Sequence, residues 1–340
     1  MTDLHKDVTE SGDPWPESAR YARLHFVSGK GGTGKTTLAS ALALALAGEG
    51  KKVLLVECEG RQGIAQLFDL PPLPPTETKI ATAEGGGSVH GLAIDIEHAL
   101  LEYLDMFYNL GFAGRAMRRI GAIDFVTTVA PGLRDVLITG KIKECVIRVD
   151  DRGRAVYDAV VVDAPPTGRI GNFLDVTTAM RDLTKTGPIR NQSDGVAQLL
   201  HSENTVVHLV TLLEAMPIQE TVEAVAELRS KDLPVGALIV NRVEPPHLTE
   251  EQIDPMAVGD VDGPALADAL TSAGLTLTDA DLQGLLTESI EHASRVQAQQ
   301  VAKAQLDEID TAAVEIPSFD DGVDLGRVYE IAALLRQAGA

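Results

Sequence analysis

The sequence predicts an α/β fold, a doubly wound and mainly parallel sheet covered by helices. Short runs rich in valine, leucine and isoleucine alternate with longer segments of helical periodicity along most of the chain. The runs are apolar throughout rather than alternating, which is typical of strands buried on both faces. No internal repeat occurs. The expected strands are 24–27, 53–56, 92–96, 157–162, 205–212, 236–240 and 314–316, and the expected helices are 38–47, 97–119, 214–229, 278–306 and 325–335.

A glycine-rich loop joins the first expected strand to the first expected helix. Gly29, four further residues and then Gly34-Lys35-Thr36 satisfy the phosphate-binding pattern in its required strand–loop–helix context. Glycines let backbone N–H groups close around a polyphosphate, and the helix directs its positive end at that charge. Lys35 is expected on the β- and γ-phosphates and the Thr36 hydroxyl on Mg²⁺. The predicted nucleotide-binding residues here are Gly29, Lys30, Gly31, Gly32, Thr33, Gly34, Lys35, Thr36 and Thr37.

Two later strands end in residues suited to the same chemistry. Asp163 closes the clearest buried run and is the expected second holder of Mg²⁺. The turn that follows, Ala164-Pro165-Pro166-Thr167-Gly168, is dense in proline and glycine and brings Gly168 towards the γ-phosphate. The run 53–56 ends in a polar turn containing Glu59, at the edge where ligands bind in open α/β sheets.

Composition bounds the remaining possibilities. The 340 residues carry a net charge of −21, which argues against nucleic acid or an anionic membrane as the partner. Two isolated cysteines, Cys58 and Cys145, fit a reducing cytoplasm and supply neither a zinc nor an iron–sulfur site. The longest apolar run is about ten residues, too short to span a bilayer. Residues 1–20 are polar and predict a mobile tail.

The helix expected over 97–119 allows two interpretations. Leu100, Leu104 and Phe107 share one face, which fits either an ordinary packed helix or a groove for an apolar client. Arg115, Arg118 and Arg119 follow as a small basic cluster, either a solvated face or the edge of a partner site. The sequence does not separate these readings.

Lys30 gives the loop its deviant form, Lys-Gly-Gly-Thr-Gly-Lys-Thr, which resembles the MinD, ParA, nitrogenase iron-protein and ArsA ATPases. The run from Asp163 to Arg169, the segment Ala130-Pro131-Gly132-Leu133, and Asn241 at a strand end resemble the ArsA branch, which includes the guided-entry ATPases for tail-anchored proteins. The resemblance covers most of residues 21–340. It implies a single ATPase domain of the phosphate-loop NTPase type, with an inserted helical subdomain from about 97–150 and 170–203. It further implies an adenine pocket at Asn241 and Pro317 and an ATP-sandwiched dimer in which Lys30 touches the partner's nucleotide.

The chain departs from that branch at three places. Glu59 stands where the branch has a water-orienting aspartate, Arg169 replaces a histidine, and the thiolate cluster of arsenite pumps is missing.

The leading hypothesis is a Mg-dependent ATPase that acts as a nucleotide-gated dimer on a protein client, which could be a membrane protein bound transiently. Lys30, Lys35 and Glu59 are its predicted catalytic residues. The partner subunit is either identical or a related ATPase. The alternatives are an ATP-binding scaffold with little hydrolysis and, less favoured, an arsenite-pump or MinD/ParA-like positioning ATPase.

Overall fold

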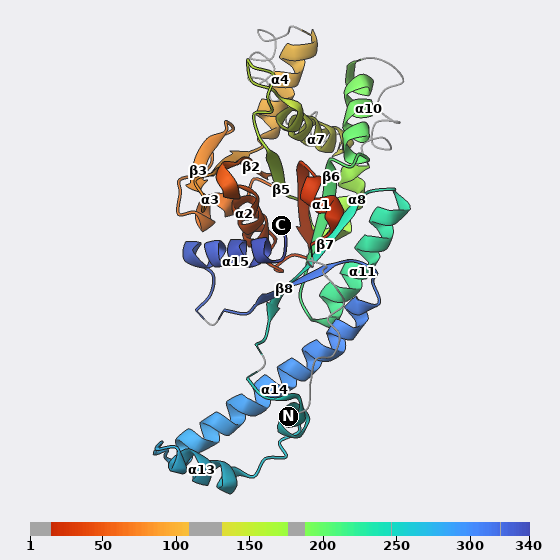
Figure 1. Ribbon diagram of the computed structural model, residues 1–340. Helices are drawn as coiled ribbons and strands as arrows, with labels where there is room; N and C mark the ends of the chain where they lie inside the picture. The colour runs from red at the N-terminus through yellow and green to blue at the C-terminus, as the bar shows by residue number, and fades with distance from the viewer. Residues whose placement is uncertain (1–14, 109–130, 176–187, 246, 320) are drawn as a thin grey trace.

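The computed structural model describes residues 15–108, 131–175, 188–245, 247–319 and 321–340, and its centre is an eight-stranded sheet (Figure 1). The strand order is β3-β4-β2-β5-β1-β6-β7-β8, and every pairing is parallel except that of β3 with β4. This confirms the predicted doubly wound α/β class. The strands are β1 (Leu24–Gly29), β2 (Lys52–Glu57), β3 (Thr78–Thr82), β4 (Ser88–Ala93), β5 (Ala159–Asp163), β6 (Thr205–Thr211), β7 (Val235–Val243) and β8 (Ala313–Pro317).

Helices cover both faces of the sheet. The connections between parallel strands must cross over, and in this fold they do so mainly through helices. The helices are α1 (Glu17–Tyr21), α2 (Lys35–Leu46), the 3₁₀ turn η1 (Gly48–Gly50), α3 (Gly63–Leu67), α4 (Ile96–Tyr108), α7 (Pro131–Ile147), α8 (Thr167–Leu174), α10 (Pro188–Leu200), α11 (Ala215–Ser230), α12 (Glu250–Ala257), α13 (Gly263–Ser272), α14 (Asp279–Asp307) and α15 (Leu325–Gln337).

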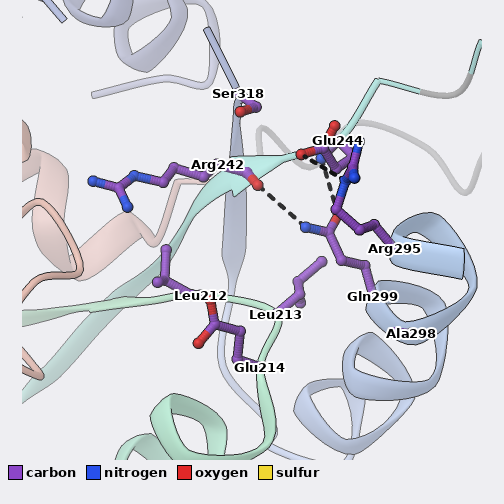
Figure 2. A pocket seen from close by; sticks show the side chains of 9 residues that line it. All are labelled: Leu212, Leu213, Glu214, Arg242, Glu244, Arg295, Ala298, Gln299 and Ser318. Atoms are coloured by element: carbon purple, nitrogen blue, oxygen red, sulfur yellow. Dashed lines mark hydrogen bonds and ion pairs between the residues drawn. The ribbon is translucent and has the colours of Figure 1, made fainter. Parts of the chain in front are cut away.

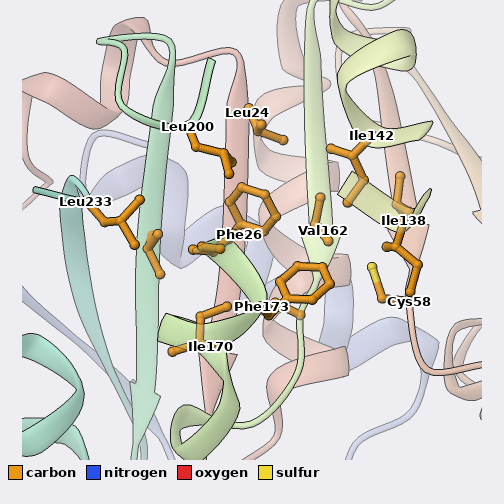
Figure 3. Packing of buried hydrophobic residues seen from close by; sticks show 14 of the residues in the cluster. Leu24, Phe26, Cys58, Ile138, Ile142, Val162, Ile170, Phe173, Leu200 and Leu233 are labelled. Carbon is orange, nitrogen blue, oxygen red and sulfur yellow. The ribbon is translucent and has the colours of Figure 1, made fainter. Parts of the chain in front are cut away.

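Alternate residues of each central strand enter two separate cores, as the period of two requires. One core takes Leu54 and Val56 of β2 and packs them under α7, α8, α10 and α11; Phe26 and Phe173 meet edge-on within it at 6.4 Å (Figure 3). The other core takes Val53 and Leu55 and packs them against α2, α3 and α15. Helix α2 runs between sheet and α15, which explains why its run 38–45 is buried all round.

The structure adds elements that the sequence reading missed. The edge strand β3 is short and mostly exposed, and its sequence Thr-Lys-Ile-Ala-Thr carries no clear alternation. Helices α12 and α13 fill a stretch for which no element was predicted. The strand expected over 92–96 ends at Ala93, because the Asp95 carboxylate accepts the His98 N–H at 2.7 Å and the chain turns into α4. The helix expected over 97–119 is described only to Tyr108, and its arginines lie outside the described residues.

Residues 15–20, predicted as part of a mobile tail, are packed against the sheet, and residues 1–14 lie outside the described residues. Trp15 is 2 % exposed and stacks on His208 with ring centroids 4.8 Å apart, and Ala19 of α1 is fully buried. Burial of an indole ring against a histidine outweighs the polar character of the segment around it. The helical subdomain expected from 97–150 and 170–203 falls partly outside the described residues. Its described helices α4 and α10 pack on α7, and α7 shares a core with the sheet.

His25 and His208 form a buried chain of hydrogen bonds between neighbouring strands. The Ala237 N–H donates to Nδ1 of His208 at 3.1 Å, which leaves the His208 proton on Nε2. That nitrogen donates to Nδ1 of His25 at 3.1 Å, and His25 Nε2 donates to the Ala22 carbonyl at 3.0 Å. Every polar atom is satisfied only while both rings are neutral. Burial accordingly lowers the pKa of His25 to about 4 and holds that of His208 well below its usual range.

We expect stability to fall as the pH drops from about 6.5 to about 4. Over that window the unfolded chain binds a proton at His25 and the folded chain does not, which costs on the order of 3 kcal/mol of unfolding free energy. Urea titrations followed by circular dichroism at several pH values, on wild type and His25→Asn, measure this. The substitution should make the pH dependence shallower, with His208 as the remaining buried histidine, whereas His201→Asn, at an exposed histidine, should leave it unchanged. Equal slopes for wild type and His25→Asn would contradict the assignment.

Candidate functional site

The phosphate loop lies between β1 and α2 with the geometry that its glycines predict. A Cβ at Gly29 would stand 2.2 Å from the Val210 carbonyl oxygen of the neighbouring strand, so no larger residue fits there. Gly34 has a φ of +92° and lies against the Asn241 amide, a conformation and a clearance that both require glycine. The loop is thereby packed closely against β6 and β7.

Thr36 and Asp163 meet across two strands that are neighbours in space. The Thr36 hydroxyl donates to Oδ2 of Asp163 at 2.6 Å. Burial raises the pKa of Asp163 to about 6, against the opposing effects of this hydrogen bond and of Lys35. A hydroxyl and a carboxylate are hard oxygen ligands, and Mg²⁺ commonly takes one or two protein ligands beside phosphates and water. The predicted metal pair therefore fits a magnesium ion.

Lys35 lies in the same place. Its ammonium group donates to the Lys30 carbonyl at 3.3 Å, and burial lowers the pKa of Lys35 while the Asp163 and Glu59 carboxylates raise it. A lysine hydrogen-bonded to its own loop can exchange that carbonyl for phosphate oxygens, which are the better partners for a cation.

Lys30 is held by its own subunit. Its ammonium group forms an ion pair with Oε1 of Glu220 on α11 at 2.8 Å, and the other Glu220 oxygen accepts the Thr167 hydroxyl at 3.3 Å. Glu220 thus links the phosphate loop to the turn before Gly168, a connection that the sequence reading missed. A Cβ at Gly168 would meet no atom within 4 Å, so this turn borders open space.

Glu59 is flanked by two arginines. Arg61 lies 3.3 Å and Arg169 3.7 Å from its carboxylate oxygens, and Arg169 also lies 3.9 Å from Asp135 at the start of α7. Burial raises the pKa of Asp135, and the charges of Arg169 and Arg134 oppose that shift. Arg169, found where a histidine was expected, therefore contacts Glu59, found where an aspartate was expected.

Glu57 is a buried carboxylate that the sequence reading did not single out. It is 2 % exposed, pairs in register with Asp163, and accepts the N–H groups of Gly63 and Ile64 at 3.3 and 3.5 Å. It therefore anchors the turn that carries Glu59 to the start of α3. An acidic residue at the end of the otherwise apolar run 53–56 was the available signal.

Asn241 and Pro317, the two residues predicted to enclose the base, line one cavity. This cavity of about 360 Å³ also includes Gly34, Thr37 and Phe319. The Asn241 amide donates to the Thr33 carbonyl at 2.8 Å, which ties the pocket to the phosphate loop.

A second cavity of about 270 Å³ lies beside the first, and Arg242 and Ser318 border both (Figure 2). Helix α14 forms one wall, where Gln299 accepts the Glu244 N–H at 2.9 Å and donates to the Arg242 carbonyl at 3.2 Å. The helix is thereby fastened to the strand end that carries Asn241.

We expect Asp163→Asn to raise the magnesium concentration needed for half-maximal ATP turnover and to lower turnover at least a hundredfold, because a neutral amide binds the ion poorly. Asp158→Asn is the matched control, since Asp158 is exposed at the opposite end of the same strand. The test is ATP turnover measured across a magnesium titration, with a chelator added to give the rate without magnesium. An unchanged magnesium dependence would remove Asp163 from the metal site.

Comparisons with known proteins agree with this geometry. The profile of the family described as "Anion-transporting ATPase" matches residues 22–199. The chain is 61 % identical, over 96 % of both chains, to proteins described as "ATPase BagA" of Mycobacterium tuberculosis and "Putative ATPase Mb3704" of Mycobacterium bovis. It is 27 % identical to "Putative arsenical pump-driving ATPase 2" of Aquifex aeolicus, over 67 % of this chain and 83 % of that one. The "ATPase GET3" of Kluyveromyces lactis is 24 % identical over 71 % and 75 %. The chain therefore belongs to the anion-transporting ATPase (ArsA) family and is an ATP-hydrolysing enzyme.

Proposed function

We propose that this ATPase is Mg-dependent and works as a nucleotide-gated dimer that couples ATP binding and hydrolysis to the binding or release of a protein client. The observation that carries the proposal is the placement of Lys30. It lies in the phosphate loop, its side chain is 28 % exposed, and its ammonium group forms an ion pair with Glu220. A cation so placed is available to a nucleotide held by a facing subunit.

Each predicted site residue takes a role in this reaction. The loop amides and Lys35 bind the phosphates and stabilise the charge that the transferring phosphoryl group carries. Thr36 and Asp163 hold Mg²⁺, which neutralises phosphate charge when bound. Glu59 positions the attacking water, and its neighbouring arginines keep that side chain in place. Asn241 and Pro317 enclose the base.

The link from site to client runs through α7. Arg169 forms ion pairs with both Glu59 and Asp135, and Asp135 lies near the start of α7. Movement of the turn at Gly168 would therefore displace a contact of α7. Helices α4 and α10 pack on α7 and would present the client surface. Among the described residues no helix has the length and apolar character of a membrane span.

The second candidate function is an ATP-binding subunit with little hydrolysis of its own, paired with a related ATPase. The observation that favours it is the double pairing of Glu59, because a carboxylate held by Arg61 and Arg169 is less free to orient water. The two proposals predict different results for the purified protein without a partner. The first predicts ATP turnover and the mass of a dimer, and the second predicts little turnover.

We expect wild type to hydrolyse ATP as a dimer, and Lys30→Ala and Glu59→Ala to lower turnover about a hundredfold each. Lys30→Ala should also weaken dimer formation, whereas Glu59→Ala should leave it intact. Steady-state turnover and light scattering with a non-hydrolysable ATP analogue measure both quantities. Lys51→Ala, at an exposed loop lysine, is the control.

The outcomes separate the candidates. A Lys30→Ala protein that dimerises and turns over like wild type would overturn the cross-subunit role. A wild-type protein that binds ATP but neither hydrolyses it nor dimerises would favour the scaffold, and native mass measurements would then look for a second ATPase chain.

A further inference from the structure

A helical arm projects from the nucleotide-binding part of the molecule. We define the acidic arm as residues 250–292, which form α12, α13 and the first half of α14 (Figure 1). Helix α14 has 29 residues, a length of about 44 Å, and its buried side chains all lie at or beyond Ala293. Helix α13 buries no residue, and α12 buries only Ile253. The arm lies outside the residues that the family profile matches.

The arm is held together on one side and left bare on the other. Gln297 donates to the Asp254 carboxylate at 2.9 Å, Leu286 lies beside Gly263, and Ile290 lies beside Gly259. These contacts fix α12 and α13 against α14. Four large apolar side chains of the arm are exposed: Val258, Leu275, Leu277 and Leu285.

Three exposed leucines lie in or near the connection between α13 and α14. Leu275, Leu277 and Leu285 are 53 %, 39 % and 37 % exposed, and we call them the leucine tip. Every residue of the connecting segment 271–280 is exposed. Apolar side chains concentrated on a projecting element are typical of a binding surface.

The charge of the arm is of one sign. It contains no lysine or arginine and ten acidic residues: Glu250, Glu251, Asp254, Asp260, Asp262, Asp268, Asp279, Asp281, Glu288 and Glu291. Helix capping accounts for Asp262 and Asp281, whose carboxylates accept N–H groups at the starts of α13 and α14 or just before them. Asp254 holds α12 to α14 through Gln297, and Glu250, Glu251 and Asp279 lie in first turns of helices, where a negative charge is favourable. Asp260, Asp268, Glu288 and Glu291 lie outside these positions. Close to half of the net charge of the chain therefore lies on this one projection.

This charge decides which partner fits. A second copy of the arm, a nucleic acid and an anionic bilayer are all repelled by it. A protein surface of opposite sign is attracted, and apolar groups on that surface would cover the leucines. A helix with lysine or arginine beside leucine satisfies both requirements with one element.

We propose that the acidic arm is a docking surface for a basic amphipathic helix of a partner protein. The leucine tip receives its apolar side chains, and the surrounding carboxylates pair with its cations. Helix α14 continues from the arm to Gln299, which is bonded to the strand end beside the base pocket, so a partner at the leucine tip lies at the far end of a helix that is anchored next to the nucleotide site.

The test uses the full-length protein and a synthetic peptide of about 18 residues, five helical turns, with leucines on one face and lysines on the other. A second peptide carries the same lysines with serine in place of leucine. By titration calorimetry the leucine peptide should bind at least tenfold more tightly than the serine peptide. Hydrogen exchange should show protection confined to residues 258–290. Raising salt should weaken both peptides.

The triple variant Leu275→Ser/Leu277→Ser/Leu285→Ser should lose the tenfold preference while retaining wild-type ATP turnover. Val301→Ser is the matched control, an exposed apolar residue of the same helix outside the arm, and should keep the preference. Equal affinity for the two peptides, or protection elsewhere on the chain, would overturn the proposal. So would sedimentation showing wild-type self-association that the triple variant abolishes, because the occupant would then be a second copy. None of these readouts depends on hydrolysis or on Lys30, so failure here leaves the proposed function standing.

Discussion

The parallel pairing of β1 with β5 is the constraint on which the site depends. It places Val27 opposite Asp163, so the last residue of one strand faces the start of the phosphate loop on the other. The Thr36 hydroxyl then needs only the first turn of α2 to reach the carboxylate. Pairing of β1 with β6 sets the loop against Val210, and β7 supplies Asn241 beneath Gly34. A shift of one residue in this register would separate the groups that bind phosphate from those that bind the metal.

The loop and the strands were predictable because their signals are local. Fixed glycine spacing and continuous apolar runs depend only on neighbouring residues in the sequence. They were sufficient to predict the strand–loop–helix unit and the buried strands. The motif resemblance that the loop carries predicted the family and the ATPase activity. The roles of individual residues, including Glu59 and Asn241, stay predictions. Glu220, Glu57 and Asp135 were not predictable as site residues, because the contacts with Lys30, Ile64 and Arg169 arise only when distant elements pack. The arm escaped prediction for a related reason. Its helices lack the continuous apolar face that usually marks a helix, since they bury almost nothing.

Several charged side chains around the phosphate loop form ion pairs. Lys30 with Glu220, and Glu59 with Arg61 and Arg169, are pairs at partly exposed positions, where each contact contributes modestly to stability. Contacts of that strength can be exchanged for another charged partner at small cost in free energy. The partly buried Thr36–Asp163 hydrogen bond and the buried Asn241–Thr33 hydrogen bond join the phosphate loop and α2 to the strand ends. These hydrogen bonds and the ion pairs lie at the same edge of the sheet.

Trp15 gives this protein an optical reporter of its own. It is the single tryptophan of the chain, and its ring lies on His208 in the strand that borders the phosphate loop. Indole emission depends strongly on the polarity and the charge around the ring, so release of the segment before β1 would change both intensity and wavelength. Fluorescence of the unmodified protein therefore follows the attachment of its N-terminal segment, without a label and without interference from any other indole.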